Sequence, residues 1–408
     1  MKKYYSLVGI ALSMLLSLTS ARGENVRIIS YHSLPKLVEQ NNLALRIAHA
    51  QVGVAKGQLQ QSGRLSNPEL SVALGGNTEF DEGGLEIGFS QQFPITNRLS
   101  LEKGFSQTLL RASELEIEVV KRELLRDARQ RYSALYYLRE KSLVLKEQQK
   151  TLEELGRFVD QAVSQAQLSS LDSTKIKIES LKFKTELNEI EASIAKESHS
   201  LKLLLGINPA EEVALAASVP SAHIMGKDAA YEKHPSYLIG ALMVEAAEQG
   251  IDLAVANRYA DVTVEVVAGL EQVQDEPVGA RSEQTLNVGV SIPLPLWNRN
   301  EGATNAAQAK KEVSSQSLQN LLRKMSSETA SLTDQYRVWQ ETADNIQNEI
   351  IPEVQGQVAE LKEAYQKGQS ELNSVFRAQE QLLSLRTTYL EAMQKAYDLN
   401  IQLQFYTQ

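Results

Sequence analysis

Cysteine is absent from this 408-residue chain, and other residues that usually carry chemistry are sparse. Without cysteine the chain has no disulfide framework, no thiolate metal site and no lipid anchor on an N-terminal cysteine. The five histidines are scattered, and no two of them stand at metal-ligand spacing. The sequence also has no glycine-rich phosphate loop and no convincing nucleophile, histidine and acid order. It therefore predicts neither a metal or other cofactor nor an enzyme.

Long apolar runs are missing beyond the first residues. Residues 1–23 combine Lys2 and Lys3 with an apolar run at 7–18 and small residues after it, which is the pattern of a cleaved secretory signal peptide. That run is too short to cross a bilayer, and no later stretch approaches the roughly 20 apolar residues that a transmembrane helix needs. We expect the mature chain to leave the cytoplasm.

Basic residues are outnumbered by acidic ones, 42 to 51. Removing residues 1–23 takes away three basic and no acidic residues, which leaves 39 against 51 and a net charge of -12. Because contacts with phosphates require a basic face, no nucleic-acid partner is expected.

An internal repeat organises the chain. Residues 85–98 align with residues 286–299 at a constant offset of 201, and the same offset relates Leu171-Asp172 to Leu372-Asn373. Upstream, residues 64–75 align with residues 258–269 at an offset of 194, so the second copy is seven residues longer in a polar loop. Fixed offsets at separated places indicate a duplication. The predicted organisation is a signal peptide at 1–23, a first repeat at 24–206, a connector at 207–232 and a second repeat at 233–408.

Each repeat reads as helix, strand, loop, strand, long helix, turn and helix. Apolar and polar residues alternate near 70–74, 85–93, 262–266 and 286–294, which predicts four half-buried strands. A soluble sandwich would show this alternation, and so would a tilted membrane-spanning strand of about ten residues. Periodicity alone leaves both readings open.

The helices are unusually long. No proline lies between Pro94 and Pro209, and a helix over 98–166 would extend roughly 104 Å at 1.5 Å per residue. The two shorter helices of that repeat, 33–64 and 172–205, add up to a similar length. In the second repeat we expect helices at 235–259, 299–367 and 373–405, with a kink at Pro352.

The apolar stripe on these helices is narrow. On the first long helix, side chains at 3-4 spacing form it, and charged residues occupy the remaining surface. Such helices pack side by side, either as the wall of a hollow tube or as a rod-like coiled coil. The stripe residues are Ile117, Val120, Leu124, Ala128, Leu135 and Leu138.

Three motifs resemble those of the TolC family of outer-membrane efflux proteins, over essentially the whole mature chain. They are the duplicated strand ending at 93–98 and 293–299, the Ser-Asn-Pro-Glu-Leu opening at 66–70, and the turn segment 364–373 followed by Ala378, Gln379 and Leu382. The first two are most similar to the branch paired with heavy-metal resistance pumps, the CzcC-like and CusC-like proteins. The residues of the strand-end turns are Pro94, Asn97, Arg98, Pro293, Pro295, Trp297, Asn298 and Arg299.

The resemblance implies a mainly α-helical protein with a membrane β-barrel. Four strands per chain cannot close a barrel, so three chains would supply twelve strands, and helical hairpins would continue as a periplasmic tube. It implies a homotrimer in the cell outer membrane, an exit duct for a tripartite pump. Its partners would be outer-membrane lipid, a periplasmic adaptor (membrane fusion protein) and an inner-membrane RND-type transporter. The acidic loops at 79–82 and near 276 would face outside the cell. The expected lipid-facing positions are Ile87, Phe89, Val288, Val290 and Ile292.

The same resemblance places a gate and the adaptor-docking tip at the helical turns. The family often carries two aspartates four and one residues before the alanine that is Ala378 here, and this chain has Ser374 and Arg377 instead. We hypothesise that Arg377 pairs with Asp172, against the simpler reading of a solvated arginine. The predicted tip residues are Asp172, Gly368, Asn373, Ser374 and Arg377.

The main alternative is a periplasmic adaptor or another soluble coiled-coil interaction protein. It shares the signal peptide and the helices, but it predicts neither two strand pairs nor their duplication. The sequence names neither the exported substrate, which could be metal cations or small toxic compounds, nor the partner pump.

Overall fold

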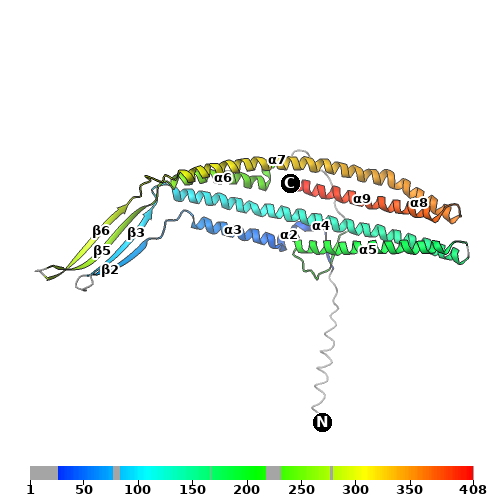
Figure 1. Cartoon of the computed structure of the whole chain (residues 1–408), viewed down its shortest axis with the longest axis horizontal. Coiled ribbons are helices and arrows are strands. Elements are labelled where there is room, and N and C mark those ends of the chain that lie inside the picture. The colour runs from blue at the N-terminus through cyan, green and yellow to red at the C-terminus, as the bar shows by residue number, and fades with distance from the viewer. Residues whose placement is uncertain (1–25, 77–82, 166, 217–230, 276–278, 408) are drawn as a thin grey trace, which may run out of the picture. The chain divides into compact units, whose positions relative to one another are not determined.

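The structure is a computed structural model that describes residues 26–76, 83–165, 167–216, 231–275 and 279–407. It is mainly helical with a few strands, as the sequence predicted. The predicted signal peptide, the acidic loops at 79–82 and near 276, and most of the connector lie outside the described residues. The elements in Figure 1 are β1 (Arg27–Ile29), η1 (Tyr31–Ser33), α2 (Leu34–Asn41), α3 (Leu43–Gln61), β2 (Glu69–Gly76), β3 (Gly83–Phe93), α4 (Arg98–Ser164), α5 (Ser170–Leu204), β4 (Val213–Leu215), η2 (Tyr231–Lys233), α6 (Pro235–Ala256), β5 (Val262–Asp275), β6 (Gly279–Ser291), α7 (Glu301–Asn345), η3 (Ile346–Ile350), α8 (Ile351–Gln366) and α9 (Leu372–Thr407).

The chain divides into two compact units, and we describe each by itself. Each unit takes segments from both predicted repeats, because its segments alternate along the sequence. Unit 1 comprises Met1–Asn42, Leu124–His223 and Tyr336–Ile401, and unit 2 comprises Leu43–Glu123, Ile224–Gln335 and Gln402–Gln408.

The sheet of unit 2 has four antiparallel strands in the order β2-β3-β5-β6 (Figure 1). Two hairpins, β2–β3 and β5–β6, meet along β3 and β5, where Phe89 pairs with Val266. The outer strands β2 and β6 each pair on one side only within the described residues. The four strands that the alternation predicted are thus present, and they form one sheet.

The long helix α4 contains 67 residues, about 100 Å of helix at 1.5 Å per residue. It matches the prediction because the segment lacks proline and is rich in helix-forming residues. The next helix, α5, begins at Ser170, and the Ser169 side chain caps it by accepting a hydrogen bond from the Leu171 amide at 3.2 Å.

Asn42 interrupts the helix that the sequence predicted over 33–64. Its backbone is extended, with ψ of 127°, so the segment forms α2 and α3 instead. The Asn42 side chain donates to the Leu204 carbonyl at 2.7 Å and satisfies an otherwise unpaired group at the end of α5. Gly206 lies against Asn41 with a φ of 60°, and a Cβ on it would stand 2.5 Å from the Asn41 carbonyl oxygen. The break between α2 and α3 therefore coincides with a contact between Asn42 and the distant end of α5, and no proline or glycine in the local sequence marks it.

The predicted helix over 299–367 is also divided. A π-helical turn, Ile346–Ile350, comes directly before Pro352, which is the second residue of α8. Proline cannot donate the amide hydrogen bond that a continuing helix would make there, and the wider turn accommodates its ring. Ile346, Ile351 and Val354 are buried against Leu382 of α9, so the apolar seam continues through the irregular turn.

A small parallel pair of strands in unit 1 was missed. β1 and β4 pair over three residues each, which is too short for a periodicity signal. Ile29 of β1 is fully buried beside Leu34 and Val38. The pair therefore fixes the start of the described chain to the core of unit 1.

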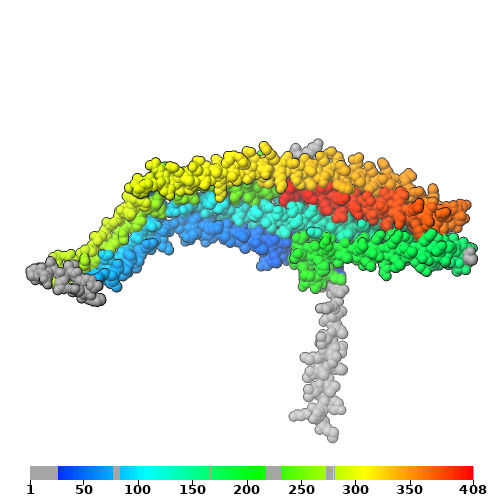
Figure 2. All heavy atoms as spheres, in the orientation of Figure 1, coloured from blue at the N-terminus to red at the C-terminus, as the bar shows by residue number. Residues whose placement is uncertain are grey.

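Unit 1 has long and narrow cores, as the predicted stripe required. In Figure 2 the segments lie side by side in the order α5 (green), α4 (cyan-green), α9 (red) and α8 (orange). Buried side chains of these helices form one continuous cluster. Ala128 and Leu135 of the predicted stripe are fully buried in a second cluster. The seam residues are Leu145, Leu152, Leu155, Val159, Ile176, Phe183, Leu187, Ile190, Tyr365, Leu372 and Val375.

A carboxyl group lies inside the helical packing of unit 1. Burial raises the pKa of Asp398 on α9 from 3.8 to about 6, although Ser133 and Gln394 favour the charged form. Among the described residues its Oδ1 atom is buried without a hydrogen-bond partner. Because the folded pKa is raised, stability from this group is present at low pH and is lost as the pH rises through about 6.

Asp398→Asn should therefore stabilise the protein at pH 7.5. The neutral amide removes a buried charge, and a shift of this size corresponds to at most about 3 kcal/mol. Unfolding by denaturant at several pH values should show the gain at pH 7.5 and little difference at pH 4. Glu391→Gln, on the exposed side of the same helix, is the matched control. An unchanged pH dependence in Asp398→Asn would contradict this assignment.

Candidate functional site

One face of the sheet is apolar across all four strands. The exposed fractions of Ile87, Phe89, Val288 and Val290 are 47%, 51%, 69% and 61%, and Ile292 just after β6 is 57% exposed. Large apolar side chains gathered on one face in this way mark a surface made for an apolar environment or a partner. The register places them in continuous rows, Leu70–Phe89–Val266–Val288 and Val72–Ile87–Ala268–Leu286.

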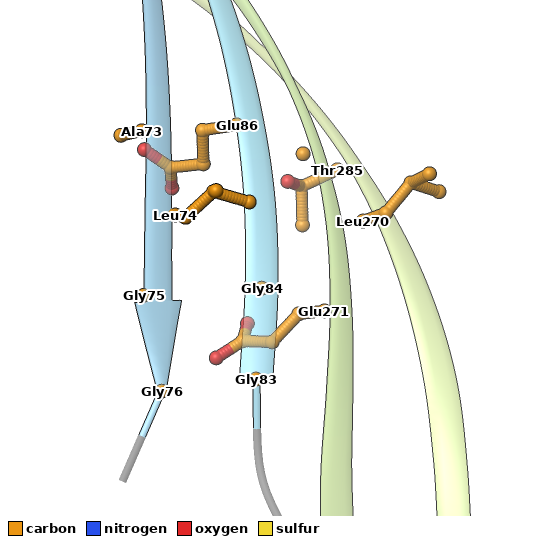
Figure 3. A pocket seen from close by; sticks show the side chains of 11 residues that line it. Ala73, Leu74, Gly75, Gly76, Gly83, Gly84, Glu86, Leu270, Glu271 and Thr285 are labelled. Carbon is orange, nitrogen blue, oxygen red and sulfur yellow. The ribbon is translucent and has the colours of Figure 1, made fainter. Parts of the chain in front are cut away.

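The opposite face is polar, acidic and partly hollow. Near the hairpin ends, glycines of β2 and β3 leave a hollow of about 400 Å³. Figure 3 shows the side chains of Glu86 and Glu271 lying over the strands around it, with Thr285 beside them. Arg281 forms an ion pair of 2.7 Å with Glu283 at this end of the sheet. The register places five carboxylates on this face: Glu69, Glu86, Glu265, Glu271 and Glu283.

The first strand-end turn fastens the two hairpins together. Arg98, the first residue of α4, donates to Asp261 and to Glu102, each at 2.7 Å. Asp261 stands just before β5, so this pair links the end of the first hairpin to the start of the second. The Asn97 carbonyl accepts from the amides of Ser100 and Leu101 and begins the helix. Pro94 and Asn97 thus shape the turn, whereas Arg98 makes the long-range contact.

The second strand-end turn is more exposed. Asn298 Oδ1 accepts from the Asn300 amide at 3.0 Å, and Asn300 has a φ of 58°. Asparagine tolerates this left-handed conformation better than most residues. The Asn300 side chain donates to the Ala254 carbonyl of α6 at 2.8 Å. Trp297 is 94% exposed, and Arg299 is exposed without an ion pair among the described residues.

Sequence reasoning missed Asp261 and Asn300 as members of these turns. Asp261 could have been found, because it aligns with Asn67 in the strand opening of the first repeat. Asn300 follows the repeated Asn-Arg pair and has no counterpart there, since Leu99 occupies the aligned position. Only its backbone conformation and its partner on α6 identify its role.

The helical turn between α8 and α9 is closed by Gly368. Its φ is 73°, and its amide donates to the Tyr365 carbonyl while the Gln369 amide donates to the Ala364 carbonyl at 2.8 Å. This is the pattern of a glycine-terminated helix, which other residues adopt only with strain. Asn373 is exposed and Ser374 is half-buried in the first turn of α9. The predicted tip residues of the second repeat therefore lie in the turn between α8 and α9 and in the first turns of α9.

The two helical turns of unit 1 lie at the same end of that unit. Asp172 of α5 raises the pKa of the Tyr365 phenol, after the larger effect of burial, so the carboxylate is near that ring. Within the chain Asp172 pairs with Lys175 at 3.6 Å and not with Arg377. Arg377 is exposed on α9 and has no ion pair among the described residues. The hypothesised pair is thus not formed within one chain.

No described helix is long and apolar enough to span a bilayer. No group of three or more histidine, cysteine or acidic residues is arranged to hold a metal ion in the described ranges.

Solved structures resemble nearly the whole chain. The structure of CusC, which was solved to follow its folding and transmembrane channel formation, matches with a TM-score of 0.76. The identity is 17%, over 95% of this chain and 94% of CusC. The outer membrane protein VceC of Vibrio cholerae matches with a TM-score of 0.72 and 18% identity over 91% and 94%. The MtrE outer membrane channel of Neisseria gonorrhoeae matches with a TM-score of 0.75 and 14% identity, over 92% of this chain and 88% of MtrE. At these identities the likeness establishes the fold.

A curated relative is similar over part of the chain. The cobalt-zinc-cadmium resistance protein CzcC of Cupriavidus metallidurans is 22% identical over 244 residues, 58% of this chain and 56% of CzcC. The chain thus spans about half the length of this relative in the match. No protein-family model matches the chain. The relatives are channel and resistance proteins and not enzymes, in agreement with the sequence prediction.

Removing the Arg98 contact should destabilise unit 2. Asp261→Ala should lower the free energy of unfolding by about 1 kcal/mol, the upper range for a partly exposed ion pair. Glu102→Ala, which removes only the pair within one helix, should cost about half as much. Chemical unfolding of both variants in the Arg98 and Arg98→Gln backgrounds measures the coupling. A cost of Asp261→Ala that persists undiminished without Arg98 would contradict the assigned contact.

Proposed function

Because this chain has the fold of the TolC-family outer-membrane channels, we propose that it is the outer-membrane exit duct of a tripartite efflux pump. The observation that carries the proposal is the sheet of unit 2, with one exposed apolar face and two outer strands that each pair on one side only in the described part of the chain. In lipid, an apolar face is favourable, whereas an open strand edge is not, because its amides and carbonyls have no water to bind.

Closing the sheet supplies the missing partners. Four strands are too few for a barrel, and three chains give twelve strands without an edge. The apolar rows then face outer-membrane lipid, and the acidic face with its hollow lines a water-filled passage. We propose a homotrimer in the outer membrane on this basis, with Ile87, Phe89, Val288, Val290 and Ile292 against lipid.

The helices would continue the passage as a periplasmic tube. Their narrow seams leave wide polar surfaces, which suits helices that line water on one side. The turns around Gly368 and Asp172 would form the tip that docks a periplasmic adaptor. An inner-membrane RND-type transporter would supply the energy for export. Asn373, Ser374 and Arg377 would lie on the same tip.

Metal cations are one substrate class that the relatives suggest, and small toxic compounds are the other. The name of CzcC refers to cobalt, zinc and cadmium resistance, and the acidic face of the sheet would favour cations near the exit. The tip of this chain carries Ser374 and Arg377 where family members often have aspartates. We therefore do not assign cation selectivity to the tip.

The predicted repeats follow from the same scheme. We propose that residues 1–23 are a signal peptide, that residues 24–206 and 233–408 are the two sequence repeats, and that residues 207–232 connect them. A periplasmic adaptor or soluble coiled-coil protein would account for the helices but would leave the exposed apolar sheet without a function.

The proposal predicts an outer-membrane trimer. After cell fractionation, the protein should be found with outer-membrane proteins and should require detergent for extraction. Native mass measurement in mild detergent should give three chains per particle. A monomer recovered from the soluble periplasmic fraction would exclude the duct.

The two faces of the sheet should respond differently to a new charge. Val290→Arg places a guanidinium on the lipid face and should cost assembly free energy, about 2 to 4 kcal/mol if the position lies near the bilayer midplane and less toward the interface. Ser291→Arg points to the polar face and should still assemble. Phe89→Arg and Ser90→Arg repeat this matched comparison on β3, away from the sheet edge. Quantifying trimers in the outer membrane measures the effect, and equal defects on both faces would show that the face assignment is wrong.

A further inference from the structure

The strand pairing inside the chain specifies how its two open edges would pair with another copy. The two hairpins have the same register once the sequence offsets of 194 and 201 are applied. Glu69 of β2 pairs with Ser90 of β3. The offset of 194 converts Glu69 into Thr263 and the offset of 201 converts Ser90 into Ser291, and these two residues are partners in β5–β6. At the far end, Gly76 pairs with Gly83, and the offsets give Leu270 and Gln284, which are also partners.

The contact between the hairpins is therefore a contact between two equivalent repeats. In it, β3 of the first repeat pairs with β5 of the second repeat, with Phe89 opposite Val266 and Ser90 opposite Glu265. The strand β6 is equivalent to β3, and β2 is equivalent to β5. Both are outer strands in the sheet. We call the β3–β5 pairing the internal seam, and the pairing of β6 with β2 of another copy the external seam. The internal seam thus provides a template for the external seam.

We propose that β6 pairs antiparallel with β2 of a second copy, with Val290 opposite Val72 of the partner subunit and Ser291 opposite Ser71 of the partner subunit. This inference rests on the proposed trimer, and it adds the register of the seam. Applying the offsets to the pairs Phe89–Val266 and Ser90–Glu265 gives these partners directly.

The proposed register keeps both faces of the sheet continuous. Val290 belongs to the apolar face, where Val72 also lies, and Ser291 belongs to the polar face with Ser71. A slip of one residue would place an apolar side chain beside a polar one along the entire seam, because side chains alternate with a period of two. A slip of two residues preserves the faces, so only a direct test of register distinguishes it.

The strand-end turns extend the same equivalence. Arg98 bonds Asp261 at 2.7 Å across the internal seam. The offsets convert this pair into Arg299 and Asn67, both exposed at the open edges. In the proposed seam, Arg299 donates to the amide oxygen of Asn67 of the partner subunit. The external seam thereby has a neutral acceptor where the internal seam has a carboxylate.

Engineered disulfides can test this register, because the chain has no native cysteine. Ser291→Cys combined with Ser71→Cys should form covalent dimers and trimers on mild oxidation of the membrane-embedded protein. Directly opposed Cα atoms lie about 4.5 to 5.5 Å apart, within the range that a disulfide accepts. A bond within one chain is excluded, because β2 and β6 are separated by three strand spacings, about 14 Å.

The matched controls are Ser291→Cys with Ala73→Cys and Ser291→Cys with Glu69→Cys, which correspond to slips of two residues. Their Cα atoms would lie about 7 to 8 Å apart in the proposed seam and should link at least several-fold less. Stronger linking of either control would overturn the register while leaving a trimeric duct intact. A trimer by native mass in which none of the three pairs links would also overturn the seam. A monomeric wild type would remove both the seam and the proposed function.

A second variant tests the seam without cysteine. Asn67→Asp should turn the Arg299 contact into an ion pair like that of Arg98 and raise the temperature at which detergent-solubilised trimers dissociate. The rise should disappear in Asn67→Asp with Arg299→Gln. An equal rise in both backgrounds, or no rise in either, would contradict the proposed contact.

Discussion

The need of every backbone amide and carbonyl for a partner governs this structure. The sheet of unit 2 combines an exposed apolar face with outer strands β2 and β6, each of which pairs on one side only among the residues that the structure describes. An apolar face favours a lipid environment, and lipid does not tolerate an open edge. A single copy of the chain satisfies only the first condition. The proposed trimer thus rests on hydrogen bonding and not on hydrophobic burial, because the apolar face points away from the neighbouring strands.

The same requirement explains the irregular places in the helices. Asn42 leaves the helical conformation and donates to a carbonyl at the end of α5. Pro352, which has no amide hydrogen, lies after a π-helical turn and near the start of α8. Gly368 adopts a left-handed conformation and completes the last turn of α8. In each case a polar backbone group at a helix end finds a partner, and the apolar seam continues alongside.

Charge is distributed according to these constraints. Most ion pairs lie on partly exposed helix surfaces, where each contributes little to stability. Arg98 differs because it joins the ends of two hairpins, so its contact helps to set their register. Asp398 is the opposite case, a carboxyl within the helical packing whose pKa burial raises to about 6. It makes the stability of unit 1 fall as the pH rises from about 4 to about 6.

The sequence by itself determined the kinds of element, their order and the faces of the strands, because these depend on residue spacing that is local. Alternation placed Phe89 and Val290 on one face, and the register confirms that they share it. The repeat offsets relate the register of one hairpin to that of the other, but the register itself is decided by the structure. Only the tertiary structure decided the break at Asn42, the π turn before Pro352, the short β1–β4 pair and the partners of Arg98 and Asn300. The π turn is a local response to the ring of Pro352. The others depend on a group far away in the sequence, such as Leu204, Asp261 or Ala254, and no local pattern records which distant group will be near.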